Sequence, residues 1–490
     1  MRKQEEFALN NTDAAAASNG PVTCLGKSFP DDEARRAYFT ELLAEKLRDP
    51  EFRKIEGFPI GTDEDILKLS DPPYYTACPN PWIADFIAEW EADKIRTAGN
   101  TDTLSPENTQ HSALSTQHSS YHREPFAADV SEGKNDPIYN AHSYHTKVPH
   151  KAIMRYILHY TEPGDIVFDG FCGTGMTGVA AQLCGDRKVV ESLGFLVQPD
   201  GTILYEETDE NNNKTWVPFS RLGARRAVLN DLSPAATFIA YNYNTPVDVA
   251  AFEKEAKRIL KEVEDECGWM YETLHTDGKT KGKINYTVWS DVFVCPNCSG
   301  EVVFWDVAVD KDAGNVKDEF QCQHCSASLT KRNMDRAWVT MYDSEIQETL
   351  RQAKQVPVLI NYSIRFSSKK IKRYEKIPDD SDLELIERID NLAVPFWIPT
   401  KRIEKGDKTP EALRIGFTHQ HHLYYKRNLL VLSNIVSKTN QRQIRLVVQS
   451  ISSTLCSKLV RYNFGNRGNG VLTGTIYIPS LGADIVDPDF

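Results

Sequence analysis

The sequence predicts an α/β protein in which a doubly wound, Rossmann-like sheet carries an inserted four-cysteine metal site and additional α+β segments. Two patterns predict this class. Residues 166–169 (IVFD) have the composition of a short buried strand, and the glycine-rich residues 170–178 (GFCGTGMTG) lead from it into a helical pattern. A strand, a glycine turn and a helix in this order begin a doubly wound sheet. Two Cys-x-x-Cys pairs within residues 285–340 predict the metal site.

The composition is that of a folded, acidic protein. The 490 residues include 57 Lys and Arg and 69 Asp and Glu, which gives a net charge of −12, and 40% are hydrophobic. This apolar content is enough for a sizeable core and excludes a disordered chain. No stretch approaches the roughly 18 to 20 apolar residues of a membrane span, and the first residues lack the apolar centre of a signal peptide. We therefore expect a soluble, cytoplasmic protein in which only a local surface can bind nucleic acid.

Asp71, Pro72, Pro73 and Tyr74 form a tetrapeptide suited to activating an aromatic amine. The exocyclic nitrogen of adenine is a poor nucleophile because its lone pair is delocalised into the ring. A carboxylate and the carbonyl oxygen of the next residue can accept both N–H groups and free that lone pair, and the prolines hold the two acceptors in place. The tyrosine ring can stack on a base that has swung out of a duplex. An ordinary proline turn with an exposed tyrosine explains the same residues.

Gly173, Gly175 and Gly178 match the pattern Gly-x-Gly-x-x-Gly. This pattern is typical of dinucleotide sites, in which an acidic residue follows about 20 positions later. Here the suitable acid is Asp231, which fits only if residues 186–220, with their PDG turn, are a two-stranded excursion. S-adenosylmethionine uses the same kind of turn and brings no phosphate. A glycine turn that binds no ligand is the remaining alternative.

Together these segments resemble the S-adenosylmethionine-dependent DNA amino-methyltransferases over about residues 71–245. Residues 71–74 match the catalytic motif of that family, residues 169–177 its cofactor loop, and residues 145–149 (HTKVP) the segment that closes over the methionine part of the cofactor. An aspartate at the first catalytic position implies adenine N6 rather than cytosine N4 as the target. The resemblance implies the catalytic residues Asp71, Pro72, Pro73 and Tyr74, and the cofactor-binding residues His145, Thr146, Lys147, Pro149, Asp169, Phe171, Gly173, Gly175, Thr177 and Asp231.

Two features depart from that family. The residues before Asp71 (DEDILKLS) make only a weak, partly charged strand, although a strand should deliver the motif to the sheet edge. Larger relatives with a zinc insertion carry an Asp-Pro-Pro-aromatic motif downstream of it, whereas this chain ends in Asp487-Pro488-Asp489-Phe490, without the second proline. The chain is therefore either a natural short form that uses Asp71 or a fragment that lacks its catalytic segment.

Cys295, Cys298, Cys322 and Cys325 predict a structural zinc ion. Each Cys-x-x-Cys pair places two thiolates on one tight turn, and two such turns complete a tetrahedral site with no open position for catalysis. We expect a zinc ribbon, which either holds DNA-contacting strands or serves as a scaffold.

His419, His421 and His422 could also suggest a metal, but no nearby acid or cysteine completes a set of ligands. We expect a surface or DNA-facing cluster instead. Cys172, inside the glycine segment, is interpreted as a small apolar filler.

The chain divides into five expected segments. They are an N-terminal helical extension (1–70) with Asp31 or Asp32 as its helix N-cap, a methyltransferase core (71–248), a helical insertion (249–284), the zinc ribbon (285–340) and a C-terminal α/β region (341–490). The core includes a mobile loop at 97–120 and a cofactor half at 145–248. The insertion contains a long charged helix of the solvent-bridging kind. The C-terminal region serves target recognition or begins a truncated catalytic half.

We therefore expect a site-specific DNA methyltransferase of prokaryotic type, which transfers a methyl group from S-adenosylmethionine to adenine N6. Its expected partners are double-stranded DNA and a cognate restriction or defence-system subunit, with no membrane partner. Two alternatives remain open. One is a non-catalytic zinc-ribbon DNA-binding protein or a truncated methyltransferase, and the other is a nucleotide-dependent oxidoreductase, which the glycine pattern alone would suggest.

Overall fold

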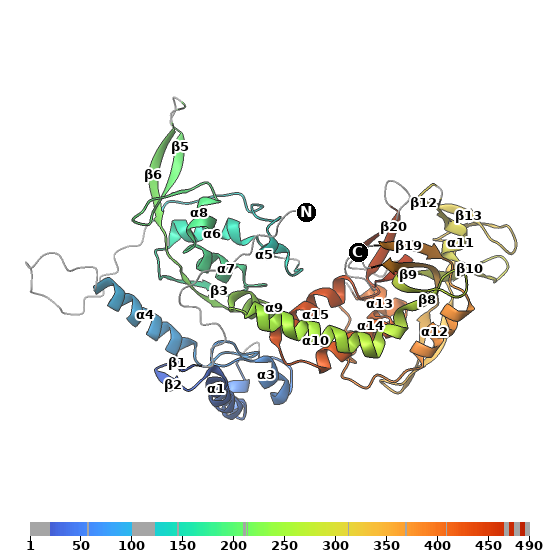
Figure 1. Cartoon of the computed structure of the whole chain (residues 1–490), viewed down its shortest axis with the longest axis horizontal. Coiled ribbons are helices and arrows are strands. Elements are labelled where there is room, and N and C mark those ends of the chain that lie inside the picture. The colour runs from blue at the N-terminus through green and yellow to red at the C-terminus, as the bar shows by residue number, and fades with distance from the viewer. Residues whose placement is uncertain are drawn as a thin grey trace, which may run out of the picture. The chain divides into compact units, whose positions relative to one another are not determined.

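The structure, a computed structural model, describes residues 20–55, 58–99, 123–144, 147–208, 212, 214–311, 313–367, 370–407, 409–464, 470–474 and 481–485 (Figure 1). The chain divides into two compact units, Met1–Val249 (unit 1) and Ala250–Phe490 (unit 2). Each unit mixes helices and strands, which confirms the predicted α/β class at the level of composition. Within the described ranges, no helix is long and apolar enough to cross a membrane.

Unit 1 contains the first nine helices and seven strands of the described residues. The helices are α1 (Asp32–Leu47), α2 (Pro50–Arg53), α3 (Asp63–Leu69), α4 (Ile83–Gly99), α5 (Pro137–Asn140), α6 (His150–Tyr160), α7 (Met176–Leu183), α8 (Arg187–Glu191) and α9 (Pro234–Asn244). The strands are β1 (Val22–Cys24), β2 (Lys27–Phe29), β3 (Ile166–Asp169), β4 (Leu196–Val197), β5 (Thr202–Thr208), β6 (Lys214–Arg221) and β7 (Arg226–Leu229).

Helix α1 begins where the sequence predicts. The Asp31 carboxylate caps it by accepting a hydrogen bond from the backbone N–H of Ala34 at 2.7 Å. On its inner side, Leu43 is buried in a core that also contains Tyr75 and, partly buried, Tyr241 of α9. The N-terminal helix and the tetrapeptide region therefore share one apolar core.

The weak strand expected before Asp71 is wrong, because these residues form helix α3. Thr62 caps this helix by accepting the backbone N–H of Asp65 at 3.1 Å. The acidic residues of its first turn also suit the positive end of the helix dipole. Asp71 therefore follows a helix, and the bridge that the structure describes for it is an isolated antiparallel one to Tyr75.

Strand β3 leads into the glycine segment and then into α7, which confirms the predicted order. β3 pairs in parallel with β7, so that Asp169 lies opposite Leu229 at the ends of the two strands. Helices α6 and α7 pack together in a core that includes Met154 and Val179. Among the described residues of unit 1, this parallel sheet has two strands, so they do not form the wider sheet of a Rossmann-like fold.

Residues 186–220 form the predicted excursion, but it has three strands instead of two. Helix α8 precedes a three-stranded antiparallel sheet in the order β4-β5-β6. The predicted turn joins β4 to β5, with Gly201 at a φ of +86° and the Gln198 N–H donating to the Thr202 carbonyl at 2.8 Å. The third strand, β6, was not expected, and it returns to pair along β5.

Unit 2 contains the remaining elements. The helices are α10 (Val249–Cys267), which starts at the unit boundary, η1 (Gly268–Tyr271), α11 (Phe304–Ala308), α12 (Asp380–Asp390), α13 (Pro410–Arg414), η2 (Gln420–Leu423), α14 (Lys426–Ser437) and α15 (Arg442–Thr454). The strands are β8 (Glu272–Leu274), β9 (Lys281–Val294), β10 (Glu301–Val303), β11 (Val309–Asp310), β12 (Asn315–Val316), β13 (Glu319–Gln321), β14 (Ser328–Thr330), β15 (Asp335–Arg336), β16 (Trp338–Asp343), β17 (Glu348–Ala353), β18 (Gln355–Ser367), β19 (Lys370–Lys376), β20 (Val460–Phe464), β21 (Gly470–Gly474) and β22 (Leu481–Ile485).

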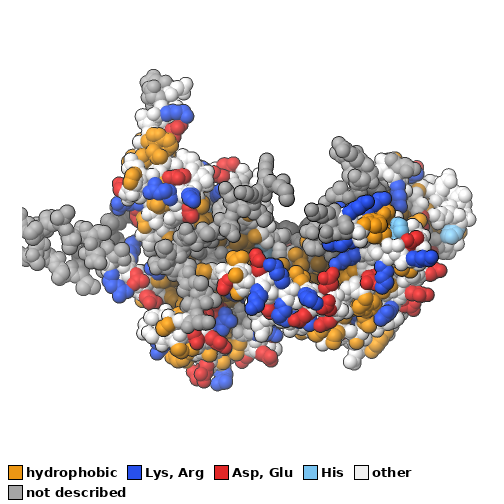
Figure 2. All heavy atoms as spheres, viewed as in Figure 1, with side chains coloured by type: hydrophobic (Ala, Val, Ile, Leu, Met, Phe, Trp, Pro, Cys, Tyr) orange, Lys and Arg blue, Asp and Glu red, His pale blue; other side chains and the backbone are white. Residues whose placement is uncertain are grey.

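Helix α10 is packed rather than solvent-bridging, so that expectation is wrong. Ile259, Val263 and Cys267 form a buried stripe in a core with side chains of α12, α14 and α15. Figure 2 shows cationic and acidic side chains mixed along the opposite, exposed side. The expected helical insertion at 249–284 is helical only as far as Tyr271, and strands β8 and β9 follow.

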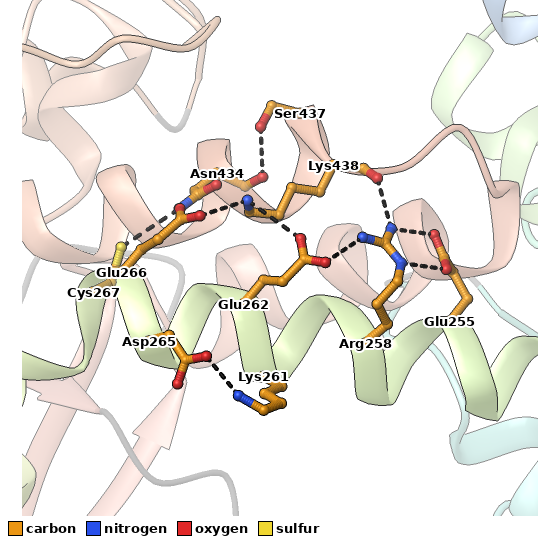
Figure 3. A network of polar contacts seen from close by, with 10 residues as sticks. All are labelled: Glu255, Arg258, Lys261, Glu262, Asp265, Glu266, Cys267, Asn434, Ser437 and Lys438. Atoms are coloured by element: carbon orange, nitrogen blue, oxygen red, sulfur yellow. Dashed lines mark hydrogen bonds and ion pairs between the residues drawn. The ribbon is translucent and has the colours of Figure 1, made fainter.

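Ion pairs join α10 to the end of α14 (Figure 3). Arg258 donates to Glu255 at 2.6 Å, to Glu262 at 2.7 Å and to the Lys438 carbonyl at 3.2 Å, and the Lys438 ammonium donates to Glu266 at 2.8 Å. Exposed pairs of this kind are screened by solvent and contribute little to stability. The buried stripe of α10 therefore contributes more to this packing than the charged network does.

The long strand β9 organises the sheet of unit 2. The antiparallel sheet has the order β19-β18-β9-β22-β20-β21, and β8, β10 and β15 also pair with β9. Side chains of β9, including Tyr286 and Val288, share one core with Cys295 and Cys322. The cysteine pairs are thus built onto the end of this sheet.

Candidate active site and metal centre

The glycine segment turns from β3 into α7 in close contact with its neighbours. Gly175 has a φ of +73°, in the left-handed region that glycine tolerates. A Cβ at this position would lie 2.7 Å from the Cβ of Ala240 on α9, and a Cβ at Gly178 would lie 2.8 Å from Cδ1 of Leu229 on β7. These two glycines therefore permit the tight packing of the segment.

Two of the predicted acids hold the glycine segment in shape. Asp231, just after β7, accepts the backbone N–H of Gly173 at 3.0 Å. Asp169, at the end of β3, accepts the Thr177 hydroxyl at 2.6 Å and the Phe171 N–H at 3.1 Å. These predicted cofactor residues therefore meet at the carboxyl ends of two parallel strands, where α/β proteins bind ligands.

The surroundings of this segment fit a ligand with both apolar and polar parts. Phe171 and Leu232 are 80% and 71% exposed, which is unusual for large apolar side chains. The hydroxyl of Thr174 is buried, and the described residues provide no hydrogen-bond partner for it. Burial, together with the Asp231 and Asp169 carboxylates, raises the pKa of Cys172 to about 12, so this thiol stays neutral.

The Asp71 carboxylate is buried and bound by three side chains. One oxygen accepts hydrogen bonds from Nη1 of Arg35 at 3.0 Å and from Nε of Arg36 at 2.8 Å, and the other accepts the Tyr241 hydroxyl. Burial by itself would raise the pKa of Asp71, but the two arginines and Tyr241 outweigh it and hold this pKa below 3.8. The carboxylate is therefore ionised at neutral pH.

The rest of the tetrapeptide is also fixed by side chains. The Pro72 carbonyl accepts Nη1 of Arg35 at 2.6 Å, and the Pro73 carbonyl accepts Nδ2 of Asn80 at 2.7 Å. The Arg35 guanidinium carbon lies 4.8 Å from the centre of the Tyr74 ring, which is 47% exposed. Asp71, Pro72 and Tyr74 thus contact one guanidinium group, and Pro73 is held by Asn80.

Sequence reasoning missed Arg35, Arg36 and Tyr241. Their partner Asp71 is separated from the arginines by about 35 positions and from Tyr241 by 170. No spacing pattern connects residues this far apart, because the contacts depend on how α1 and α9 pack.

Helix α9 contacts both motifs. The Tyr241 ring stacks on Tyr75, next to the tetrapeptide, with 4.8 Å between ring centroids. One turn further, Nδ2 of Asn244 donates to the Gly175 carbonyl at 3.0 Å. Adjoining faces of one helix therefore hold the predicted catalytic residues and the predicted cofactor loop.

Part of the predicted cofactor segment at 145–149 has no described position. His145 and Thr146 lie outside the described residues, as do residues 100–120 of the predicted loop and residues 486–490. Lys147 donates to the carbonyls of Tyr139 and His142, and Pro149 is the N-cap of α6. The described contacts thus do not bring Lys147 to the glycine segment. Tyr144, which was not predicted, lies there instead, because a Cβ at Gly173 would be 3.3 Å from its ring.

The four predicted metal ligands of unit 2 form a compact cluster. Their Sγ atoms all lie within 4.8 Å of one another, and the Sγ–Sγ distance is 3.8 Å both for Cys295–Cys325 and for Cys298–Cys322. A disulfide would require about 2.05 Å. Four sulfurs around one ion at about 2.3 Å lie roughly 3.8 Å apart in a tetrahedron. The cluster therefore has the dimensions of a tetrahedral metal site.

The two cysteine turns have nearly the same local structure. Ser299 and Ser326 follow the second cysteine of each pair, with φ values of +57° and +58°. Each serine donates its N–H to the carbonyl of the first cysteine, at 2.9 Å in both turns. In addition, Asn297 donates to the Cys325 sulfur at 3.3 Å. Hydrogen bonds to sulfur of this kind support thiolate ligands.

Two of the three clustered histidines, His421 and His422, are buried, so the predicted surface or DNA-facing position is wrong for them. His421 and His422 are each 6% exposed and both contact Oδ2 of Asp343, at 2.7 and 2.8 Å. The acid that the sequence failed to supply is thus Asp343, at the end of β16. Because Asp343 lies 78 positions before His421, no local pattern could reveal it.

The hydrogen bonds of His422 favour a structural role for this cluster. Its Nδ1 accepts the backbone N–H groups of Thr418 and His419, at 3.1 and 3.2 Å. In a neutral ring the proton then lies on Nε2, which donates it to Asp343. A protonated Nε2 has no lone pair for a metal ion. We therefore interpret this group as a buried hydrogen-bonded pair of histidines around one carboxylate.

Comparison with known proteins identifies one matching segment. Residues 58–207, about a third of the chain, match the N6/N4-type family model described as DNA methylase, and this range includes Asp71 and the glycine segment but ends before Asp231. No curated protein and no solved structure matches the chain. The match favours the methyltransferase interpretation over the oxidoreductase one. Residues 58–207 are therefore similar to the DNA methylase family of the N6/N4 type.

Proposed function

We propose that the protein is an S-adenosylmethionine-dependent DNA methyltransferase that acts on N6 of adenine. The observation that carries this proposal is the pair of acceptors at the tetrapeptide. The Asp71 carboxylate and the Pro72 carbonyl are close enough for one nitrogen, Nη1 of Arg35, to donate to both, at 3.0 and 2.6 Å. The exocyclic amine of adenine likewise carries two N–H groups on one nitrogen. The family match supplies the substrate class, DNA.

The proposed mechanism uses the tetrapeptide to polarise the target amine. Asp71 and the Pro72 carbonyl accept its two N–H groups, while the exposed ring of Tyr74 stacks on the extrahelical base. Because the pKa of Asp71 is held below 3.8, the carboxylate stays charged and acts by electrostatics rather than by removing a proton first. It then stabilises the positive charge that develops on the nitrogen, and after methyl transfer the nitrogen releases its extra proton to solvent water.

The glycine segment is the proposed cofactor site. S-adenosylmethionine supplies an electrophilic methyl group when bound. Asp231 and the Thr174 hydroxyl are the polar groups that would hold it, and the exposed Phe171 ring would cover an apolar part. The neutral Cys172 thiol is not a nucleophile in this proposal. None is needed, because a bound cofactor would give its methyl group to the amine directly, and the sulfonium sulfur would keep the electrons of the broken S–C bond and leave as a thioether. We also propose a Rossmann-like class I arrangement around β3 and β7, because the glycine segment and Asp231 lie at the carboxyl ends of these two parallel strands.

Zinc is the proposed ion at the four cysteines of unit 2. A four-thiolate site is closed and structural, so we assign it no step in the reaction. Double-stranded DNA is the proposed partner, and a restriction or defence-system subunit is the proposed context. We further propose the boundaries 71–248 for the catalytic core and 285–340 for the zinc ribbon.

The first test is methyl transfer from labelled S-adenosylmethionine to duplex DNA of mixed sequence, with the product nucleosides separated by mass spectrometry. We expect N6-methyladenine. Asp71→Asn keeps the size of the side chain but removes its charge, and we expect it to lower the rate by about 100- to 1,000-fold, as for loss of one preorganised electrostatic group.

Asp85→Asn is the matched control for this change. Asp85 is an exposed residue of α4 within the family-matched segment, so the variant removes the same charge without touching the tetrapeptide. Full activity of a folded Asp71→Asn protein would contradict the proposed role of Asp71. Formation of N4-methylcytosine alone would contradict adenine as the target.

A further inference from the structure

We propose that Arg35 occupies the subsite of the target base and that the base binds by displacing its guanidinium group. This inference rests on the proposed function, since it concerns the same tetrapeptide. In this inference the subsite of the target base is occupied by a side chain of the protein itself. The subsite is therefore closed until DNA binds.

The contacts of the guanidinium reproduce those that the target amine requires. Both N–H groups of Nη1 are used, one toward Asp71 at 3.0 Å and one toward the Pro72 carbonyl at 2.6 Å. The flat guanidinium also lies over the Tyr74 ring, with its carbon 4.8 Å from the ring centre. A planar group that donates through one NH₂ and stacks on the tyrosine has the same recognition features as an adenine base.

A base cannot bind in this way while Arg35 stays in place. The Arg35 side chain is 1% exposed, and it lies against both acceptors and the ring, where the base would have to bind. Its other edge is bound to Asp32, through Nε at 3.0 Å and Nη2 at 2.7 Å. Asp32 is half exposed at the start of α1, so this tether lies beside solvent. Displacement therefore exchanges the contacts of Nη1 for those of the amine, and the tether can keep the arginine close by.

Arg36 provides a control that distinguishes the filling of the subsite by Arg35 from the positive charge beside Asp71. It pairs with the same oxygen of Asp71 at 2.8 Å, but its side chain is half exposed. Its described hydrogen bond goes to Asp71 alone, whereas Arg35 also reaches Pro72. Arg36→Ala thus removes one positive charge from the carboxylate and leaves the subsite filled.

The test is calorimetric binding of adenosine to the full chain, with S-adenosylhomocysteine present to saturate the cofactor site. We expect Arg35→Ala to raise the affinity for adenosine by at least about tenfold over the wild type, and Arg36→Ala to give no such gain. N6,N6-dimethyladenosine, which has no N–H group to donate, should not bind the opened subsite. Added guanidinium ion, far below concentrations that unfold proteins, should refill the subsite of Arg35→Ala and weaken adenosine binding.

The outcomes distinguish this inference from the proposed function. A folded Arg35→Ala protein that gains no adenosine affinity, or that methylates DNA better when guanidinium is added, would show that Arg35 is a permanent support, and would refute the inference even if the wild type methylates adenine. A gain in adenosine binding without methyl transfer by any variant would support the occupancy and refute the proposed function. If Arg35→Ala does not fold, Asp32→Asn tests the same idea, because it loosens the tether and should give a smaller gain. No gain in a folded Asp32→Asn protein would count against the inference.

Discussion

Two buried carboxylates, Asp71 in unit 1 and Asp343 in unit 2, are each held by donors from distant parts of the chain. Asp71 is bound by two arginines, and its environment suits a permanently charged acceptor. Asp343 is bound by two histidines, and hydrogen bonds from His422 and His421, opposing the effect of burial, lower its pKa to about 2. Arginine keeps its proton in any accessible pH range, whereas histidine does not. The two sites should therefore respond differently to acid.

We predict that unit 2 loses stability as the pH falls from 6.5 to about 4. Burial lowers the pKa of His422 from 6.5 to about 4, although Asp343 opposes this shift. Between these values the unfolded chain binds a proton that the folded chain does not, so acid favours unfolding. The Asp343 carboxylate adds to this loss only below its ordinary pKa of 3.8. Urea unfolding, followed by a signal from unit 2, measures the effect.

His422→Gln should flatten this pH dependence, since it removes the titrating group. The other charged neighbours, Lys458 and Asp343, remain in that variant. Replacement of His159, which lies in unit 1, serves as the control and should leave the slope for unit 2 unchanged. An equal slope in the wild type and His422→Gln would contradict the prediction.

Residues whose chemistry is complete within a short segment could be predicted from the sequence. Spacing and residue type within a few positions define the glycine turn after Asp169 and the two Cys-x-x-Cys turns, so both could be predicted without knowledge of distant contacts. Asp231 was found by its place after a second strand. Arg35 and Asp343 could not be found in this way, because their roles arise from packing between elements that are far apart in the chain.

At the scale of elements, α9 is the part of unit 1 on which the site depends. It follows Asp231 directly, holds the tetrapeptide through Tyr241 and holds the glycine segment through Asn244. A small shift of this helix would therefore move both halves of the proposed site together. The glycines of the segment are what allow it to pack so closely.

We predict that Gly175→Ala destabilises unit 1 by more than the cost of its backbone angle alone. A left-handed angle costs a non-glycine residue about 1–2 kcal/mol, and here the new Cβ would also lie 2.7 Å from Ala240. Gly164→Ala is the control, because Gly164 has a similar φ of +80° and no atom within 4 Å of the added Cβ. Urea unfolding should show Gly175→Ala to be at least about 1 kcal/mol less stable than Gly164→Ala. Equal stabilities of the Gly175→Ala and Gly164→Ala proteins would show that the added Cβ at position 175 does not clash with α9.

The order of elements around the glycine segment followed from periodicity and turns. Residues 166–169 form the strand that the sequence predicts, and helix α7 follows the glycine segment as predicted. Residues 63–69 do not form the expected strand, because three acids at a helix start with a threonine cap favour a helix over a strand. The mistake at α10 has a different origin. Its buried stripe is present in the sequence, but the many charged residues between the members of the stripe are equally typical of a solvent-exposed helix.

At the scale of the whole molecule, the described structure separates the two kinds of chemistry. The family match and the proposed catalytic residues lie in unit 1, and the cysteine cluster and the histidine pair lie in unit 2. Ligands of one unit should therefore affect its own stability first.

We predict two thermal transitions that respond to different ligands. S-adenosylhomocysteine at a hundredfold excess over its dissociation constant should add about 2.7 kcal/mol to the free energy of unfolding of unit 1 and so raise the temperature of its transition. Metal chelation should lower or abolish the transition of unit 2, because structural zinc sites contribute on the order of 10 kcal/mol. Scanning calorimetry measures both.

Zinc analysis by mass spectrometry provides the control for this experiment. Cys298→Ser should lose the ion and behave like the chelated protein, whereas Cys456→Ser, outside the cluster in the same unit, should keep it. Retention of one equivalent of zinc by Cys298→Ser, with an unchanged second transition, would contradict the proposed metal site.

The long strand β9 has a consequence for how unit 2 reaches its native state. One of its edges pairs with β18 soon after synthesis, but the other pairs with β22, where Leu481 lies opposite Ser290. The ribosome must therefore add nearly two hundred residues before residues 286–290 on that second edge are covered. Pairings of such large sequence separation form slowly, and an uncovered apolar edge attracts other chains in the meantime. Nascent chains of this protein should thus depend on chaperones that shield this part of β9 until β22 has been made.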